Sequence, residues 1–164
     1  MDKLLTGQRV MIMVANGFNE DDMTVVQKSL AEAGALAQII SPENGLTNSW
    51  NEAGWGHHYP VDGNIGEVLS VDFDRIVILG GLLSVNKLVS NPHVERILSG
   101  FMAAEKPIAL MGESASLLPE AKMTDGEVSL NGMILTGDVK KCRTEFVEQM
   151  IDLFSDQVEF QQAA

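Results

Sequence analysis

Cysteine, basic side chains and long apolar runs are all scarce in this chain of 164 residues. A single cysteine cannot form a disulfide within the chain, so we expect a reducing compartment, the cytoplasm. Lysine and arginine number 11 against 23 acidic residues, which gives a formal net charge of −12. A surface of that charge repels phosphate backbones and anionic lipids, so we expect no nucleic-acid and no membrane partner. No apolar run approaches the roughly 20 residues that span a bilayer.

The chain does contain a regular alternation of two apolar patterns. Short continuous apolar runs, typical of strands buried on both faces, lie at residues 10–15, 37–40, 75–79 and 108–111. Amphipathic stretches that predict helices lie at residues 20–33, 82–89, 92–104 and 144–154. This alternation predicts one α/β domain over residues 1–164, a mostly parallel sheet with helices on both faces. We expect residues 155–164 to form a frayed tail.

Three stretches are predicted from weaker patterns. Residues 43–66 are rich in Gly, Asn, Trp and His, and their short alternating patches predict a small hairpin or an irregular excursion. Residues 65–69 predict a single helical turn. Asn131-Gly132 is a strong hairpin signal between two strand-like pieces at residues 127–130 and 133–135.

The stretch KPIALMGESASLL, residues 106–118, has the pattern of an active-site turn. The apolar run 108–111 stops at Gly112, and a helix-like segment begins at Glu113. A strand that turns directly into a helix is the geometry of a nucleophile elbow, whose tip carries the attacking atom. Gly112 has no side chain, so the sequence predicts an elbow without its nucleophile.

Ligands of parallel α/β sheets bind beyond the carboxyl ends of the strands. In this chain those ends are residues 16–22, 80–83, 112–114 and 137–138. The candidate binding positions among them are the glycines where the backbone can approach a ligand closely, Gly17, Gly80, Gly81 and Gly112.

Three of these ends carry the motifs of a known family: VANGFNEDD at residues 14–22, DFDRIVILGG at 72–81 and KPIALMGESASLL. On them the chain resembles the ThiJ/PfpI superfamily over residues 9–154. The resemblance implies a flavodoxin-like three-layer sandwich of the class I glutamine amidotransferase-like kind. In this family the first motif supplies a carboxylate that bonds the nucleophile, and Asp22 falls at or near that position. Paired glycines supply backbone amides to an oxyanion site, which Gly80 and Gly81 match.

The third motif departs from the family. Its usual Cys-His-Gly is replaced here by Gly112, Glu113 and Ser114. The segment after the elbow is also shorter, so no downstream catalytic histidine or acid can be placed. The wording PIALMGES resembles a second group, the C-terminal domain of large-subunit catalases, which has the same fold and has also lost the cysteine.

Each polar candidate at the elbow has a structural and a functional interpretation. Asp22 and Glu113 both lie at predicted helix starts, where the helix dipole stabilises acidic side chains. As neighbours they would instead raise one another's pKa, so that one could hold a proton for acid–base chemistry. Ser114 could be a nucleophile, although no histidine is placed to activate it.

The remaining candidates lie outside the elbow. His57 and His58 are adjacent in the irregular segment, and neighbouring side chains on a strand point to opposite faces, so they rarely share a metal. One of them could reach the elbow across the sheet or across a dimer interface. Cys142 lies among three basic residues that favour its thiolate, and the alternative is a surface thiol without function. We expect no metal and no cofactor.

Two functional hypotheses stay open. The leading one is a divergent, non-catalytic ThiJ/PfpI protein, a pseudoenzyme that binds a small molecule or a protein partner at the vestigial elbow. The alternative is a hydrolase or a glyoxalase-type lyase that acts on small carbonyl compounds with Glu113 and Asp22. We also expect a homodimer, from the resemblance and because the region of Trp50, Trp55 and Tyr59 offers aromatic surface suited to an interface.

Overall fold

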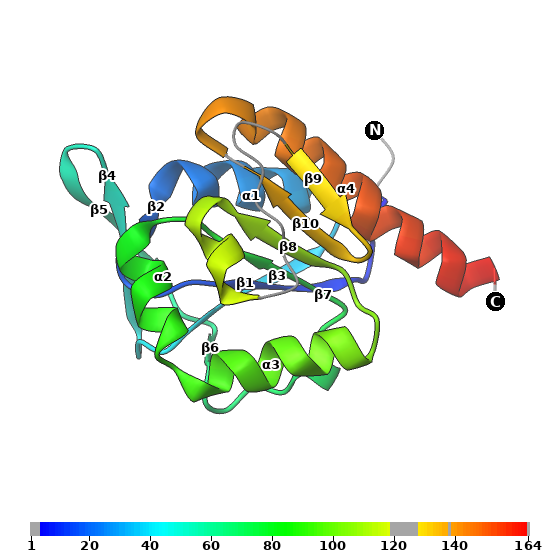
Figure 1. The fold of residues 1–164 in the computed structure, drawn as a ribbon, viewed down its shortest axis with the longest axis horizontal. Helices are drawn as coiled ribbons and strands as arrows, with labels where there is room; N and C mark the ends of the chain where they lie inside the picture. Colours follow the sequence, from blue (N-terminus) through cyan, green and yellow to red (C-terminus); the bar gives the residue numbers. More distant parts are fainter. Residues whose placement is uncertain (1–3, 119–127, 138, 164) are drawn as a thin grey trace.

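A seven-stranded sheet forms the centre of the molecule, with the strand order β6-β3-β1-β7-β8-β10-β9 (Figure 1). The computed structural model describes residues 4–118, 128–137 and 139–163, and their side chains except those of residues 139–142 and 156–163. Every pairing in this sheet is parallel except that of β9 with β10. The strands are β1 (Arg9–Met13), β3 (Leu36–Ser41), β6 (Gly63–Asn64), β7 (Arg75–Ile78), β8 (Ile108–Met111), β9 (Val128–Asn131) and β10 (Ile134–Gly137).

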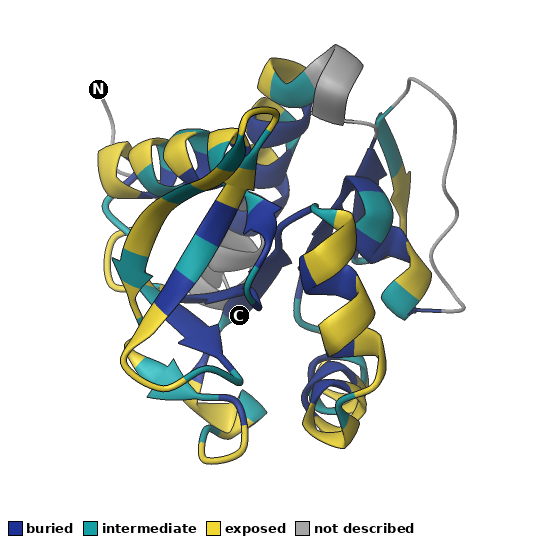
Figure 2. Cartoon of the chain, turned by 90° about the vertical axis from the view of Figure 1, so that its left-hand side faces the viewer, coloured by how far each residue is buried: buried dark blue, intermediate teal, exposed yellow. Residues whose placement is uncertain are grey.

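Helices cover both faces of the sheet, so the predicted three-layer sandwich is confirmed. One face packs against α1 (Glu20–Glu32) and α4 (Val139–Ala163), and the other against α2 (Leu82–Val89) and α3 (Pro92–Ala103). Alternation within β1 shows why both faces are apolar, because Val10 and Ile12 face the α1 side whereas Met11 and Met13 face the α3 side. Figure 2 shows the strands buried between helices that are exposed on their outer faces.

The predicted hairpin in residues 43–66 is also present. β4 (Leu46–Asn51) and β5 (Gly54–Pro60) pair antiparallel, and β4 pairs in parallel with the short strand β2 (Phe18–Asn19). This second sheet projects from one end of the molecule (Figure 1). Since β2 leads directly into α1, the hairpin lies beside the carboxyl end of β1.

Three elements differ from their predictions. The segment after the elbow is a 3₁₀ helix, η2 (Gly112–Leu117), because two serine hydroxyls in it donate to backbone carbonyls three residues earlier. Residues 65–67 form a turn, and the helical residues come later, as the 3₁₀ helix η1 (Ser70–Asp72). α4 is longer than predicted and continues through residues 155–163, a stretch without the Gly or Pro that would end a helix.

The second predicted hairpin is confirmed where it is described, since β9 and β10 flank Asn131-Gly132 and Gly132 has a φ of +64°. The sequence also predicts a polar connection at residues 119–126, between the elbow and this hairpin, and that stretch lies outside the described residues. No described helix combines the length and the apolar character that a membrane crossing requires.

Candidate functional site

The elbow lies where the sequence predicts it, at the junction of β8 and η2. Gly112 is buried and has a φ of +55°, in the left-handed region that L side chains rarely adopt. The neighbouring strand ends supply Gly17, Gly80 and Gly81, so four predicted positions do meet at one edge of the sheet. The backbone of an active-site turn is therefore present, without a side chain at its tip.

Asp22 is fully buried in the first turn of α1. The Asn19 side chain caps this helix by accepting the Asp22 N–H at 3.0 Å. The Asp22 carboxylate accepts two hydrogen bonds, from the Gly80 N–H at 3.0 Å and from the Arg143 Nε at 3.0 Å. Burial raises the pKa of Asp22, Arg143 and the Gly80 N–H oppose that rise, and the charge of Glu113 adds to it.

Glu113 reaches the second glycine of the pair. Its Oε2 accepts the Gly81 N–H at 3.1 Å, and its side chain is half-buried. A Cβ placed on Gly80 would lie 3.0 Å from the Asp22 Oδ2 and 3.0 Å from the Glu113 Oε2. The structure therefore brings the two predicted carboxylates together on either side of Gly80, and a side chain at position 80 would require these carboxylates to shift.

The paired amides of Gly80 and Gly81 already have acceptors. Each donates its N–H to a carboxylate oxygen of the chain itself, Gly80 to Asp22 and Gly81 to Glu113. An incoming anion would have to displace one of these carboxylates and would meet the charge of the other. In this arrangement an oxyanion would compete with the chain's own carboxylates for the two amides.

Gly17 and Gly81 both have a positive φ and lie where a Cβ would clash with a neighbour. Gly81 has a φ of +113°, and a Cβ there would lie 2.6 Å from the Gly17 carbonyl oxygen. Gly17 has a φ of +96°, packs against the Leu83 side chain and donates its N–H to the Asn48 carbonyl at 2.8 Å. The hydrogen bond from Gly17 to Asn48 therefore connects the hairpin to the loop that follows β1.

Ser114 is buried beside the elbow. Its hydroxyl is directed at two backbone carbonyls, that of Met111 at 2.8 Å and that of Ile78 at 3.1 Å. A hydroxyl held in this way fixes η2 against β7 and β8. We interpret Ser114 as a structural residue, because its oxygen faces backbone and not a basic side chain.

The two histidines do not reach the elbow. His57 lies on β5, where its backbone N–H and Nδ1 contact the Glu20 carboxylate at 2.6 and 3.1 Å, and its ring is exposed. The His58 Nδ1 is hydrogen-bonded to the Asn48 Oδ1. Within the described residues, no group of three His, Cys, Asp or Glu side chains could hold a metal ion. The side chain of Cys142 lies outside the described part of the chain.

Arg143 is the site residue that the sequence did not reveal. It lies on α4, 121 positions from Asp22 along the chain, and retains 24% of its side-chain exposure. The sequence placed it only as a basic neighbour of Cys142. No local pattern marks an arginine whose partner comes from another helix, so only the packing of α4 against α1 identifies it.

Comparisons with known proteins identify the family. The sequence profile of the DJ-1/PfpI family matches residues 8–159. General stress protein 18 of Bacillus subtilis is 25% identical over 93% of this chain and 87% of its own length. Catalase HPII of Pseudomonas aeruginosa is 24% identical over 73% of this chain but 16% of its own length. The crystal structure of Drosophila melanogaster DJ-1beta superposes with a TM-score of 0.78 at 16% identity, over 94% of each chain.

The chain belongs to the DJ-1/PfpI family, and its fold is the flavodoxin-like α/β sandwich that the resemblance implies.

Proposed function

We propose that this member of the DJ-1/PfpI family does no covalent chemistry at its elbow and binds a small molecule or a protein partner there. One observation carries the proposal: the Gly80 and Gly81 amides donate to the chain's own Asp22 and Glu113 carboxylates. Donors that are already satisfied by anions of the chain cannot stabilise a developing oxyanion without first losing those partners.

The absence of a bond-forming group supports the same proposal. Gly112 offers no nucleophile, and the Ser114 hydroxyl is buried against backbone carbonyls. Nucleophilic catalysis needs an attacking atom and a base within hydrogen-bond reach of each other. Neither Gly112 nor Ser114 meets that requirement.

The charges of the site favour a small molecule that donates hydrogen bonds and is neutral or cationic. The Asp22 charge is compensated by Arg143, and no cationic side chain in the described part of the chain forms an ion pair with Glu113. Glu113 is half-buried, and among the described residues only its Oε2 accepts a hydrogen bond, so its second oxygen can accept one from a ligand.

The test combines turnover and labelling. All proteins carry Cys142→Ser, which removes the native thiol, and the form with no other change serves as the wild-type elbow. Methylglyoxal consumption is measured for this form, for Gly112→Cys and for Gly112→Cys/Glu113→Gln. We expect no turnover above background from the wild type or from Gly112→Cys. Iodoacetamide should label the new thiol faster when Glu113 is also replaced, because a neighbouring carboxylate disfavours the thiolate.

The alternative function is a hydrolase or lyase that uses Glu113 and Asp22 on a small carbonyl compound. The raised pKa of Asp22 and the adjacency of Glu113 favour it, since a carboxylic acid that holds its proton can act as a general acid. Wild-type turnover that disappears in Glu113→Gln would establish this enzyme and refute the non-catalytic proposal.

We also propose that the protein is a homodimer that uses the hairpin. Trp50 and Trp55 are 40% and 57% exposed and pack edge-to-face, with their ring centroids 5.1 Å apart. Tyr59 belongs to the other side of the hairpin, where its ring packs on Phe18 at 5.5 Å. Light scattering after size exclusion should show a dimer that Trp55→Ala weakens, and a wild type that is monomeric at micromolar concentration would contradict the proposal.

A further inference from the structure

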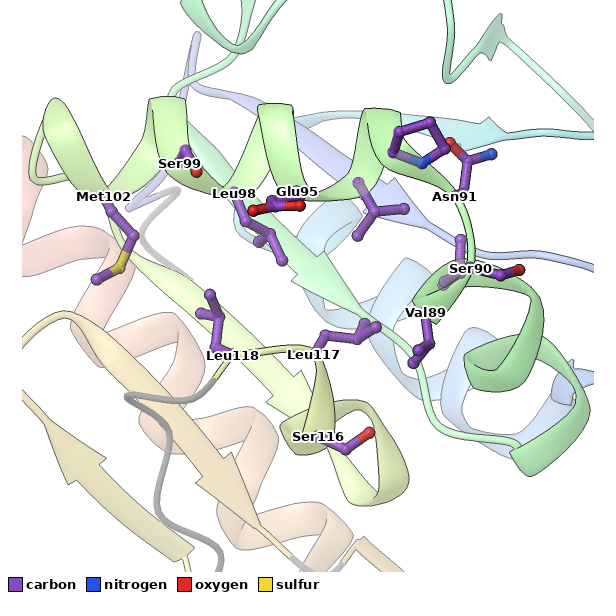
Figure 3. A pocket seen from close by; sticks show the side chains of 13 residues that line it. Val89, Ser90, Asn91, Glu95, Leu98, Ser99, Met102, Ser116, Leu117 and Leu118 are labelled. Carbon is purple, nitrogen blue, oxygen red and sulfur yellow. The ribbon is translucent and has the colours of Figure 1, made fainter.

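A groove separate from the elbow lies between the C-terminal end of α2, the length of α3 and the end of η2 (Figure 3). Its volume is about 670 Å³, within the range of small-molecule sites in proteins. The end of η2 contributes Ser116 and Leu117, and Leu118 follows that helix, whereas the elbow uses Gly112 and Glu113 at its other end.

The floor of the groove is apolar. Leu88, Val94, Leu98 and Leu118 are at most 8% exposed and belong to the core on the α3 side of the sheet. Half-buried and exposed apolar side chains, such as Met102, form the walls. In Figure 3, Leu98 and Met102 project from α3 towards η2, so apolar atoms line both sides. The hydrophobic part of a ligand would be buried here.

The rim of the groove presents mainly hydrogen-bond acceptors. The Ser90 hydroxyl donates its proton to the Lys87 carbonyl at 3.0 Å, and the Ser116 hydroxyl donates to the Glu113 carbonyl at 3.0 Å. Both oxygens keep lone pairs for a ligand. The backbone at the start of α3 offers few donors, since Pro92 has no N–H and the His93 N–H is capped by the Asn91 side chain, whose amide nitrogen is the donor of this rim.

Among the described residues that line this groove, Glu95 has the only ionisable side chain. It lies one helical turn before Ser99 on α3, and no described cationic side chain forms an ion pair with it. The net charge of −12 adds to the local negative potential. An apolar floor, an acceptor rim and one free carboxylate are complementary to a protonated amine on an apolar body.

We infer that this groove is a binding site for a small amphiphilic amine. The inference does not depend on the function proposed for the elbow, because it uses no residue of the Gly80–Gly112 site. The apolar body lies on Leu88, Leu98 and Leu118, and the ammonium group bonds the Glu95 carboxylate on α3.

Three probes of one shape and different charge test the inference. 2-Phenylethylamine, 2-phenylethanol and phenylacetate are titrated into the isotope-labelled full chain, and amide chemical shifts are followed by NMR. We expect the amine to bind most tightly and phenylacetate least, with the shifts centred on Leu88, Leu98 and Ser99. An equal or tighter affinity for phenylacetate would overturn the inference.

Variants separate this groove from other acidic surfaces. Glu95→Gln should weaken the amine about fivefold and leave the alcohol unchanged, the size expected for one partly solvated ion pair. Glu52→Gln, an equal change of charge on the hairpin, should have no effect. Ser99→Trp changes an exposed position and should block both ligands by filling the groove. Unchanged amine binding in Glu95→Gln or Ser99→Trp would refute the assignment.

A second outcome would refute it equally. Glu32, Glu148 and Asp152 line another, smaller groove of about 270 Å³ between α1 and α4. Amine-induced shifts centred on Ser29, Ala33 and Val147 would place the ligand there, and the α3 groove would then not be the amine site.

Discussion

Arg143→Met is the substitution that most directly tests the electrostatics of the elbow. It removes the guanidinium that donates to the fully buried Asp22 at 3.0 Å and leaves the carboxylate with the Gly80 N–H as its remaining partner. Removing one member of a fully buried ion pair costs about 3–5 kcal/mol. Because Arg143 is 24% exposed, solvent screens part of the interaction, and we expect a loss of about 2 kcal/mol at neutral pH.

The loss should depend on pH with a definite sign. Burial already raises the pKa of Asp22, and Arg143 opposes that rise, so Arg143→Met should raise the pKa further. A folded-state pKa above the unfolded value means that stability is lost as pH rises through the folded pKa. The gap in unfolding free energy between wild type and variant should therefore be small in acid, where Asp22 is protonated in both, and reach its full size towards pH 8.

Urea unfolding at several pH values, from the acid limit of the folded state up to about pH 8, measures this gap. Asp22→Asn supplies the matched background, since it removes the charge that Arg143 neutralises. There Arg143→Met should cost less than about 0.5 kcal/mol, which leaves a coupling free energy of about 1.5 kcal/mol. A coupling near zero, or a cost that does not change with pH, would show that Arg143 does not neutralise Asp22.

Two further predictions concern the backbone and the hairpin. Gly45→Ala should lower the unfolding free energy by about 1 kcal/mol, since Gly45 has a φ of +81° but its Cβ would lie in open space. Gly17→Ala should lower it by about 2 kcal/mol more, because its Cβ would clash with Leu83. Thermal melts that show equal destabilisation by the two substitutions would contradict this packing. Hydrogen bonds from the hairpin hold the pKa of Glu20 below its usual range, so the stability that Glu20 contributes is present above its unfolded pKa and is lost as pH falls through its folded pKa. Glu20→Gln should therefore weaken the attachment of the hairpin at neutral pH. Tryptophan fluorescence or proteolysis identical to that of the wild type would show that Glu20 does not hold the hairpin.

The central strands could be predicted because they are buried on both faces. Such strands are continuous apolar runs, without an alternation of polar and apolar residues that could be mistaken for another pattern. β8 begins and ends at the predicted residues, and β7 differs by one residue. The 3₁₀ form of η2 could not be predicted in the same way. It depends on the Ser114 and Ser116 hydroxyls bonding carbonyls three residues back, and the same serines are compatible with an α-helix start.

The sequence predicted the position of the candidate site but not the hydrogen bonds within it. Strand ends of a parallel sheet meet at one edge, so Asp22, Gly80 and Glu113 could be placed near each other from order alone. The hydrogen-bond partner of Glu113 could not be predicted, because the helix dipole alone is a sufficient reason for a glutamate at a helix start. In the structure its acceptor oxygen is used by Gly81, 32 residues away, a contact set by the close packing of α2 against η2.

The two elbow carboxylates differ in their partners, and this difference determines which substitution could restore anion binding at the elbow. Asp22 is compensated by a cation, whereas Glu113 is held by the uncharged Gly81 N–H. The uncompensated charge of the elbow therefore lies on Glu113, and a thiolate at position 112 would add a second one beside it in a partly buried site, where repulsion exceeds that in water. Replacing Glu113 with Gln removes this repulsion and frees the Gly81 N–H from its anion in one step, whereas Gly112→Cys alone does neither. The double variant is thus the form in which the chain could show whether it retains a usable oxyanion site.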